Sequence, residues 1–191
     1  MNNRLTSKIR EGPLLTKFGG SWVQPLHYAI TRNNQDMARF LVLQKAAKMY
    51  SISGNSSTPL SCAIEEGILE MIEFFLECGY PVSGAPGHKL AIPLHCAATS
   101  NRSEDGRIIK LLLNAGAKVD QKDSNGATPL MTAAKSKFMR RPTYIPPFHT
   151  LLEAGADVNA KDNDGNTALH YATRIGINSA FITVLLQYGA D

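Results

Sequence analysis

A six-residue phrase occurs five times in this chain, and its near-constant spacing is the feature that most constrains the fold. The copies read QPLHYA, TPLSCA, IPLHCA, TPLMTA and TALHYA, and they begin at Gln24, Thr58, Ile92, Thr128 and Thr167. The steps between them are 34, 34, 36 and 39 residues. A period of this length indicates a stack of supersecondary units in which each unit buries its apolar side against its neighbours. Such a stack offers a long surface and no obvious cleft for chemistry.

The residues around each phrase indicate that it opens a helix. Four copies carry a proline at the second position, where the first helical turn has no use for an N–H group: Pro25, Pro59, Pro93 and Pro129. Threonine precedes three of the helices and can cap them: Thr58, Thr128 and Thr167. Glycine follows four later apolar runs, as expected at helix C-termini: Gly79, Gly116, Gly155 and Gly189.

A second phrase closes the later units, reading LLLNAGAKVD at 111–120, LLEAGADVNA at 151–160 and LLQYGAD at 185–191. Loops reading DSNG at 123–126 and DNDG at 162–165 complete the pattern. Over residues 21–191 the chain resembles the ankyrin repeat family. The resemblance implies an all-α solenoid of stacked helix-turn-helix units with projecting hairpin loops.

The spacing divides the chain into a basic lead-in or cap at 1–20 and a repeat domain at 21–191. The predicted repeats are 21–53, 54–87, 88–122, 123–161 and 162–191. The first is degenerate, because Lys45 stands where the closing glycine is expected, so its second helix is predicted to continue. The third and fourth carry insertions, near 100–107 and 136–147. Val184, Leu185, Leu186 and Tyr188 show no polar replacement at the end of the stack, which suggests that further repeats or another domain follow in the natural protein.

Composition excludes several classes of protein. No apolar run reaches the roughly 18 residues that a membrane span needs, so no membrane insertion is expected. The first residues lack the apolar stretch of a signal peptide. Three cysteines are too few for a disulfide framework, and with spacings of 16 and 18 residues they form no CxxC pair. We therefore expect a reducing, intracellular location, either cytoplasmic or nuclear, or the host cytosol if the protein is a secreted effector.

The net charge of +4 is unevenly distributed. Residues 1–50 carry eight Lys or Arg against two acids, and residues 51–100 carry one against five. Residues 101–150 carry nine against four, and residues 151–191 carry two against five. This alternation favours a partner with a matching charge pattern over a uniform polyanion.

No catalytic or metal-binding constellation is present in the sequence. His27, His95 and His170 occupy one position of the repeated phrase. The resemblance implies that this histidine bonds the phrase's threonine and nearby backbone, although only Thr167 and His170 keep the full pair. A metal site is the alternative, but one histidine per unit spreads the rings along the stack. No nucleophile–base pair or phosphate loop stands out, so we predict no enzyme activity and no cofactor.

The resemblance places partner contacts on the exposed side of the first helices and on the loop tips. Carried over by motif position, the first-helix candidates are Arg32, Glu65, Glu66, Ser100, Lys135 and Arg174. The loop tips are Asn55, Lys89, Asn125, Asn163 and Asp164. The fourth-repeat insert interleaves basic and aromatic residues and is either a solvated loop or a recognition loop; its candidates are Phe138, Arg140, Arg141 and Tyr144. Trp22 is a possible aromatic anchor or a buried residue of the cap.

The preferred function is a non-enzymatic, monomeric scaffold that binds an unidentified protein partner through a concave face and loop tips. Two alternatives stay open. One is nucleic-acid association through the basic insert at 135–147, which the acidic flanking repeats disfavour. The other is that the array is the targeting segment of a larger modular enzyme or a secreted effector.

Overall fold

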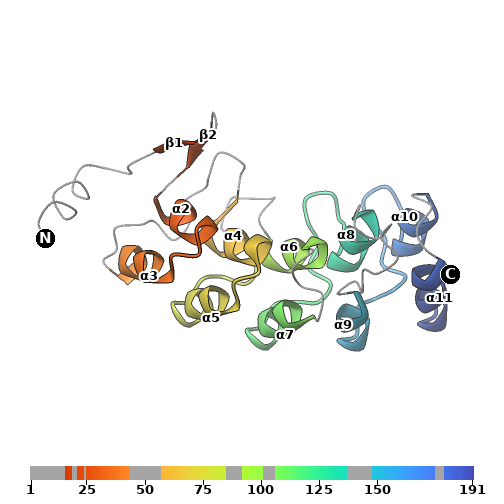
Figure 1. The fold of residues 1–191 in the computed structure, drawn as a ribbon. Coiled ribbons are helices and arrows are strands. Elements are labelled where there is room, and N and C mark those ends of the chain that lie inside the picture. Colours follow the sequence, from red (N-terminus) through yellow and green to blue (C-terminus); the bar gives the residue numbers. More distant parts are fainter. Residues whose placement is uncertain are drawn as a thin grey trace, which may run out of the picture.

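The computed structural model describes residues 16–18, 21–23, 25–43, 57–84, 92–100, 106–136, 148–174 and 179–191. A short antiparallel hairpin, β1 (Thr16–Phe18) paired with β2 (Ser21–Val23), precedes the helices. It crosses the predicted boundary at residue 20, so the segment before the first phrase and the start of the first repeat form one element. Five helix pairs then follow in chain order (Figure 1).

The helices form two parallel rows. The first row consists of α2 (Pro25–Thr31), α4 (Pro59–Glu66), α6 (Pro93–Thr99), α8 (Pro129–Lys135) and α10 (Ala168–Arg174). The second row consists of α3 (Gln35–Leu43), α5 (Leu69–Glu77), α7 (Arg107–Asn114), α9 (Phe148–Glu153) and α11 (Ser179–Gln187). Each first-row helix packs on the next one, and α7 packs on both α5 and α9 (Figure 1). The prediction of an all-α solenoid is confirmed by this arrangement of helix pairs; the hairpin is the one addition among the described residues.

The core lies between the rows. The leucine of the repeated phrase is at most 1% exposed in four units, at Leu26, Leu60, Leu94 and Leu130. Burying one leucine side chain contributes about 1.5–3 kcal/mol. Because these leucines belong to one buried cluster that includes residues of all five units, the phrase contributes cohesion between units as well as within them.

The predicted caps form where the phrase begins with threonine. The Thr58 side chain accepts a hydrogen bond from the backbone N–H of Ser61, and Thr128 does the same for Met131. Ile92 begins α6 without a side-chain cap. The four closing glycines have positive φ, as predicted: Gly79, Gly116, Gly155 and Gly189.

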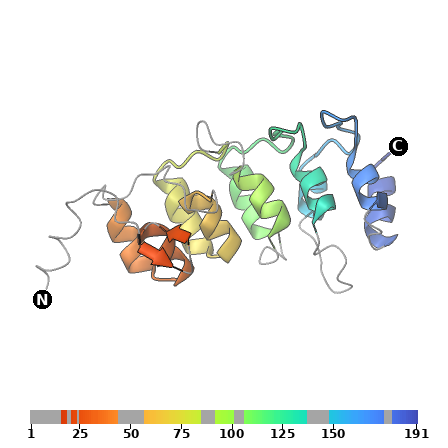
Figure 2. The same ribbon diagram turned by 90° about the horizontal axis from the view of Figure 1, so that it is seen from above.

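The hairpin loops lie along one edge of the stack (Figure 2). Asp123 Oδ1 accepts from the backbone N–H groups of Asn125, at 2.8 Å, and Ala127, at 2.9 Å. Asp162 closes the next loop in the same way. The two tips are joined directly, because Asn163 N–H donates to Asn125 O at 3.0 Å. The loops of units 4 and 5 are therefore joined by a direct backbone hydrogen bond.

Some predictions fall outside the described residues. Helix α3 ends at Leu43, and the predicted continuation beyond Lys45 lies in the part of the chain that is not described. The same is true of most of both insertions, at 101–105 and 137–147. Among the described helices, none has the length and apolar content to cross a membrane.

Candidate protein-interaction face

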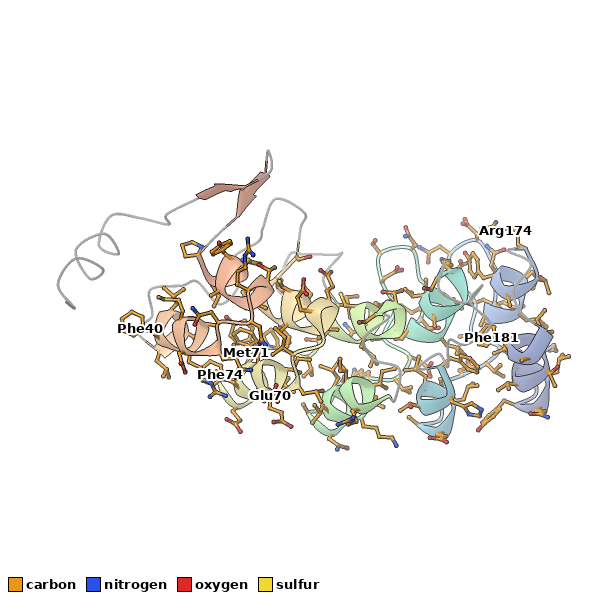
Figure 3. All side chains as sticks on the ribbon, in the orientation of Figure 1. Phe40, Glu70, Met71, Phe74, Arg174 and Phe181 are labelled. Carbon is orange, nitrogen blue, oxygen red and sulfur yellow. The ribbon has the colours of Figure 1, made fainter. Side chains whose placement is uncertain are left out.

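One residue in each unit occupies the same position near the end of its first helix, six residues after the second residue of the phrase. This row is defined here as the first-helix face and consists of Thr31, Glu65, Thr99, Lys135 and Arg174. None of the five is buried, and Thr31, Glu65 and Arg174 are exposed. Figure 3 shows Arg174 projecting from α10, whereas Glu70 lies on α5 in the second row. The face therefore carries one side chain per unit that can be substituted without disturbing the buried core.

The face is acidic at unit 2. The Glu65 carboxylate accepts a hydrogen bond from Ser57 Oγ at 3.2 Å. Partial burial raises the pKa of Glu65, against the lowering effect of Ser57, and neighbouring Glu66 raises it further.

The negative charge of Glu65 in unit 2 also affects a cysteine in unit 3. Burial raises the pKa of Cys62 to about 12, with smaller contributions from Glu65 and Glu66. Burial also raises the pKa of Cys96 to about 12, and Glu65 again adds to the shift. Both thiols are therefore protonated at neutral pH and poor nucleophiles.

The face is basic at units 4 and 5, where two cations share one aromatic ring. Lys135 Nζ lies 3.9 Å from the centroid of the Tyr171 ring, and the Arg174 guanidinium carbon lies 5.3 Å from it. The Tyr171 hydroxyl donates to the Asp162 carboxylate. This bond is the main cause that lowers the pKa of Asp162, and Lys135 adds a smaller effect in the same direction. The ring thus holds Lys135 and Arg174 close together at the surface.

Unit 1 carries an analogous pair. The Arg32 guanidinium carbon lies 5.4 Å from the centroid of the Tyr28 ring, and Arg32 is exposed. Tyr28 and Tyr171 occupy the same position in their phrases. From unit 1 to unit 5, the charges at or next to the face are therefore positive, negative, neutral, positive and positive.

The exposure predicted for Ser100 is wrong. Ser100 is 7% exposed, and its Oγ donates to Ile64 O at 3.3 Å. The helix ends at Thr99, so Ser100 turns back against the preceding unit and does not belong to the surface. Ser136, its counterpart in unit 4, is also buried, at 8% exposed. Ser100 is therefore removed from the candidates for partner contact.

The other candidates are distributed unevenly. Glu66 is half-buried beside Glu65, and the loop-tip residues Asn125, Asn163 and Asp164 are exposed. Six candidates lie outside the described residues: Phe138, Arg140, Arg141, Tyr144, Asn55 and Lys89. For Trp22 the structure describes only the backbone, in β2. The nucleic-acid alternative rests mainly on residues 137–147 and stays a prediction.

The phrase histidines join units to one another. His27 Nε2 lies 2.8 Å from Ser57 O, and His95 Nε2 lies 2.9 Å from Ala127 O, in each case across to the next unit. Because a carbonyl only accepts, Nε2 carries the proton in both rings. Burial lowers the pKa of both histidines, so they are neutral at pH 7. Their Nδ1 atoms are buried and have no hydrogen-bond partner among the described residues.

The histidine network is complete only where threonine is present. His170 Nδ1 lies 2.9 Å from Thr167 Oγ1, as the resemblance implied. Ile92 offers no such oxygen to His95. Within the described ranges, no group of three His, Cys, Asp or Glu side chains is arranged to hold a metal ion. These histidines therefore have a structural role.

Sequence reasoning missed the coupling of Lys135, Tyr171 and Asp162. The signal was available, because Tyr171 lies at the position of the phrase that borders the face, next to the unit whose first helix ends at Lys135. Their approach depends on the stacking distance between α8 and α10, which the sequence pattern alone does not supply.

The stack of helix pairs, with one non-buried residue per unit on the first-helix face, has the architecture of a repeat protein. The family model of ankyrin repeats (three copies) matches residues 14–85 and 94–191. The chain therefore belongs to the ankyrin repeat family, whose arrays generally mediate protein–protein interaction and are typically non-enzymatic.

Three curated relatives each match part of this chain. The chain is 34% identical over 119 residues to Putative palmitoyltransferase ZDHHC13 of Danio rerio, covering 62% of this chain and 18% of the relative. It is 33% identical over 87 residues to Zinc finger CCCH domain-containing protein 47 of Arabidopsis thaliana, covering 44% and 15%. It is 32% identical over 112 residues to Ankyrin repeat protein nuc-2 of Neurospora crassa, covering 58% and 10%. The matched region spans less than a fifth of each relative.

Proposed function

We propose that this chain is a protein-binding module whose partner lies across the first-helix face and the adjoining hairpin tips. The observation that carries the proposal is the row of non-buried side chains at Thr31, Glu65, Thr99, Lys135 and Arg174, one per unit, on helices fixed by buried leucines. Because the helices and loop edge are already ordered, binding costs little conformational entropy. The side chains that select the partner lie on the surface and are not part of the buried core.

A binding experiment with matched variants tests the proposal. A displayed library of protein fragments is selected on the immobilised chain, and the affinity of each purified binder is measured by calorimetry. The Glu65→Ala/Arg174→Ala variant removes one acid and one base from the face. The control, Glu73→Ala/Lys110→Ala, removes the same charges from exposed positions in α5 and α7.

We expect the face variant to weaken binding by about tenfold or more and the control to change it less than about twofold. Melting temperatures should stay within a few degrees of wild type for both variants, since all four side chains are exposed. Binders that lose equal affinity to both variants, or none to the face variant, would contradict the assignment of the face.

A second proposal concerns the context of the array. The curated relatives are five or more times longer than the matched region, since it covers 18%, 15% and 10% of them. This favours the array as the recognition segment of a larger protein. Sequencing of the full transcript tests this, and a coding region that ends at Asp191 would count against it.

The cysteines support the proposed intracellular location. Cys62, Cys78 and Cys96 are the chain's three cysteines, and all are free thiols. Free thiols persist in reducing compartments. Localisation of a tagged full-length protein by microscopy checks this proposal, and secretion into an oxidising medium would contradict it.

A further inference from the structure

The charges on the first-helix face are ordered along the stack and do not neutralise one another. Glu65 stands at unit 2 with Glu66 beside it, Thr99 is neutral at unit 3, and Lys135 and Arg174 stand at units 4 and 5. Lys135 and Arg174 are held together by the Tyr171 ring. Glu65 accepts a hydrogen bond from the neutral hydroxyl of Ser57. The acidic end and the basic end are therefore separate features of one surface.

From this order we infer that the face binds an extended peptide segment with a cationic side chain at one end and two carboxylates further along. The cation lies against Glu65, and the carboxylates lie against Lys135 and Arg174. This inference rests on the proposed function and specifies the chemistry of the partner.

The spacing of the units sets the spacing of the charges in the partner. Adjacent packed helices lie about 8–10 Å apart, so Glu65 and Lys135, two units apart, are separated by about 16–20 Å along the stack. An extended chain advances about 3.3 Å per residue. The cation and the first carboxylate should therefore be about five or six residues apart, and the second carboxylate about three residues beyond the first.

Two structural details favour the binding of carboxylates at the basic end. Tyr171 donates its hydroxyl to Asp162, so the ring is fixed in place and both cations rest against it. Arg174 is exposed and Lys135 is half-buried, so neither residue is enclosed in the core. Arg32 adds a cation beyond the acidic end, which disfavours a segment that is basic throughout.

A pair of synthetic peptides tests the inference. The ordered peptide carries two arginines, a five-residue Gly/Ser spacer and two glutamates three residues apart. Its isomer has the same composition with the charges alternating along the chain. Affinities are measured by fluorescence anisotropy at low ionic strength, and the contact residues are located from amide chemical-shift changes.

We expect the ordered peptide to bind about five- to tenfold more tightly than its isomer, with shift changes at Glu65, Lys135 and Arg174. The Lys135→Gln/Arg174→Gln variant should lose this preference. The control variant Lys110→Gln/Lys118→Gln, which removes the same charge from exposed positions elsewhere, should keep it. Arg174→Gln alone should lose part of the preference, and it avoids any loosening of α8 against α10 that substitution of Lys135 could cause.

Equal affinity for both peptides, absence of binding by either, or equal loss in the two double variants would overturn the inference. These outcomes differ from failure of the proposed function. In that case, selected protein binders would be insensitive to substitution on the face, whatever the peptides do.

Discussion

At the scale of single residues, Ile92 is the position where the repeated phrase departs most consequentially from its own pattern. Thr58 and Thr128 cap their helices, whereas Ile92 leaves α6 uncapped and His95 Nδ1 without a partner. A hydroxyl at position 92 would supply both missing interactions, as Thr167 does for His170.

Comparison of Ile92→Thr with Ile92→Val isolates that hydroxyl, because the two variants have nearly the same shape. We predict that the Thr variant is more stable than the Val variant by about 1 kcal/mol, the usual value of an N-cap or a satisfied polar group. Urea denaturation of both proteins measures the difference. A Val variant of equal or greater stability would show that position 92 cannot cap α6.

The buried histidines give a second prediction, on pH. Unfolded histidine takes up a proton near pH 6.5, whereas burial lowers the pKa of His27 and His95 in the folded protein. Below pH 6.5 the unfolded chain therefore binds more protons than the folded one. The free energy of unfolding should fall as the pH is lowered from 7 to 5, with a slope of at most about 1.4 kcal/mol per pH unit for each histidine.

Urea denaturation at pH 7, 6 and 5 measures this slope. In His95→Gln, which retains an amide donor for Ala127 O, the share of the slope due to His95 should disappear. A pH profile that is flat, or one that rises on acidification, would argue against neutral buried histidines.

At the scale of elements, the hairpin loops are fastened to each other as well as to their own helices. Gly126 and Gly165 occupy equivalent positions, with φ of 75° and 80°. A Cβ at Gly126 would lie 2.9 Å from Asn163 N and 2.4 Å from its Oδ1, whereas a Cβ at Gly165 would meet nothing within 4 Å.

Comparison of alanine substitutions at Gly126 and Gly165 separates the stability cost of backbone strain from the cost of disturbed packing between the loops. Both Gly126→Ala and Gly165→Ala should lose about 1–2 kcal/mol through the positive φ. Gly126→Ala should lose roughly a further 1–3 kcal/mol, because the added methyl group displaces the neighbouring loop. Thermal denaturation gives both values, and equal losses would mean that the contact between the two tips is not important for stability.

The elements also show which features could be predicted from sequence. The helix pairs, the threonine caps and the closing glycines follow from local rules, because phrase and period recur in register. The β1–β2 hairpin does not follow, since strands of three residues leave little pattern. The burial of Ser100 depends on where α6 ends, and the meeting of Lys135 with Tyr171 depends on how closely two helices stack. Those properties are set by tertiary packing.

At the scale of the whole molecule, the most extensive contacts between described helices of different units join adjacent units, so the position of a defect along the stack should matter. Leu94 is fully buried in α6 at the centre, and Leu185 is fully buried in α11 at the end of the described chain. Either Leu→Ala substitution should cost about 2–5 kcal/mol locally.

The two variants should differ in how far the damage spreads. Leu94→Ala should increase amide hydrogen exchange in the units on both sides, because the central unit supports both. Leu185→Ala should increase it mainly in α10 and α11. Hydrogen-exchange mass spectrometry distinguishes the cases, and uniform loosening by both variants would indicate a single cooperative core instead of coupled units.

Lys135 has two roles in this molecule, and the two roles place opposing constraints on its substitution during evolution. Its ammonium group rests on a ring of the adjoining repeat while also supplying surface charge. Substitution of Arg174 affects a contact within α10, whereas substitution of Lys135 risks loosening α8 from α10. Changes in binding specificity during evolution should therefore occur first at Glu65 and Arg174 and last at Lys135.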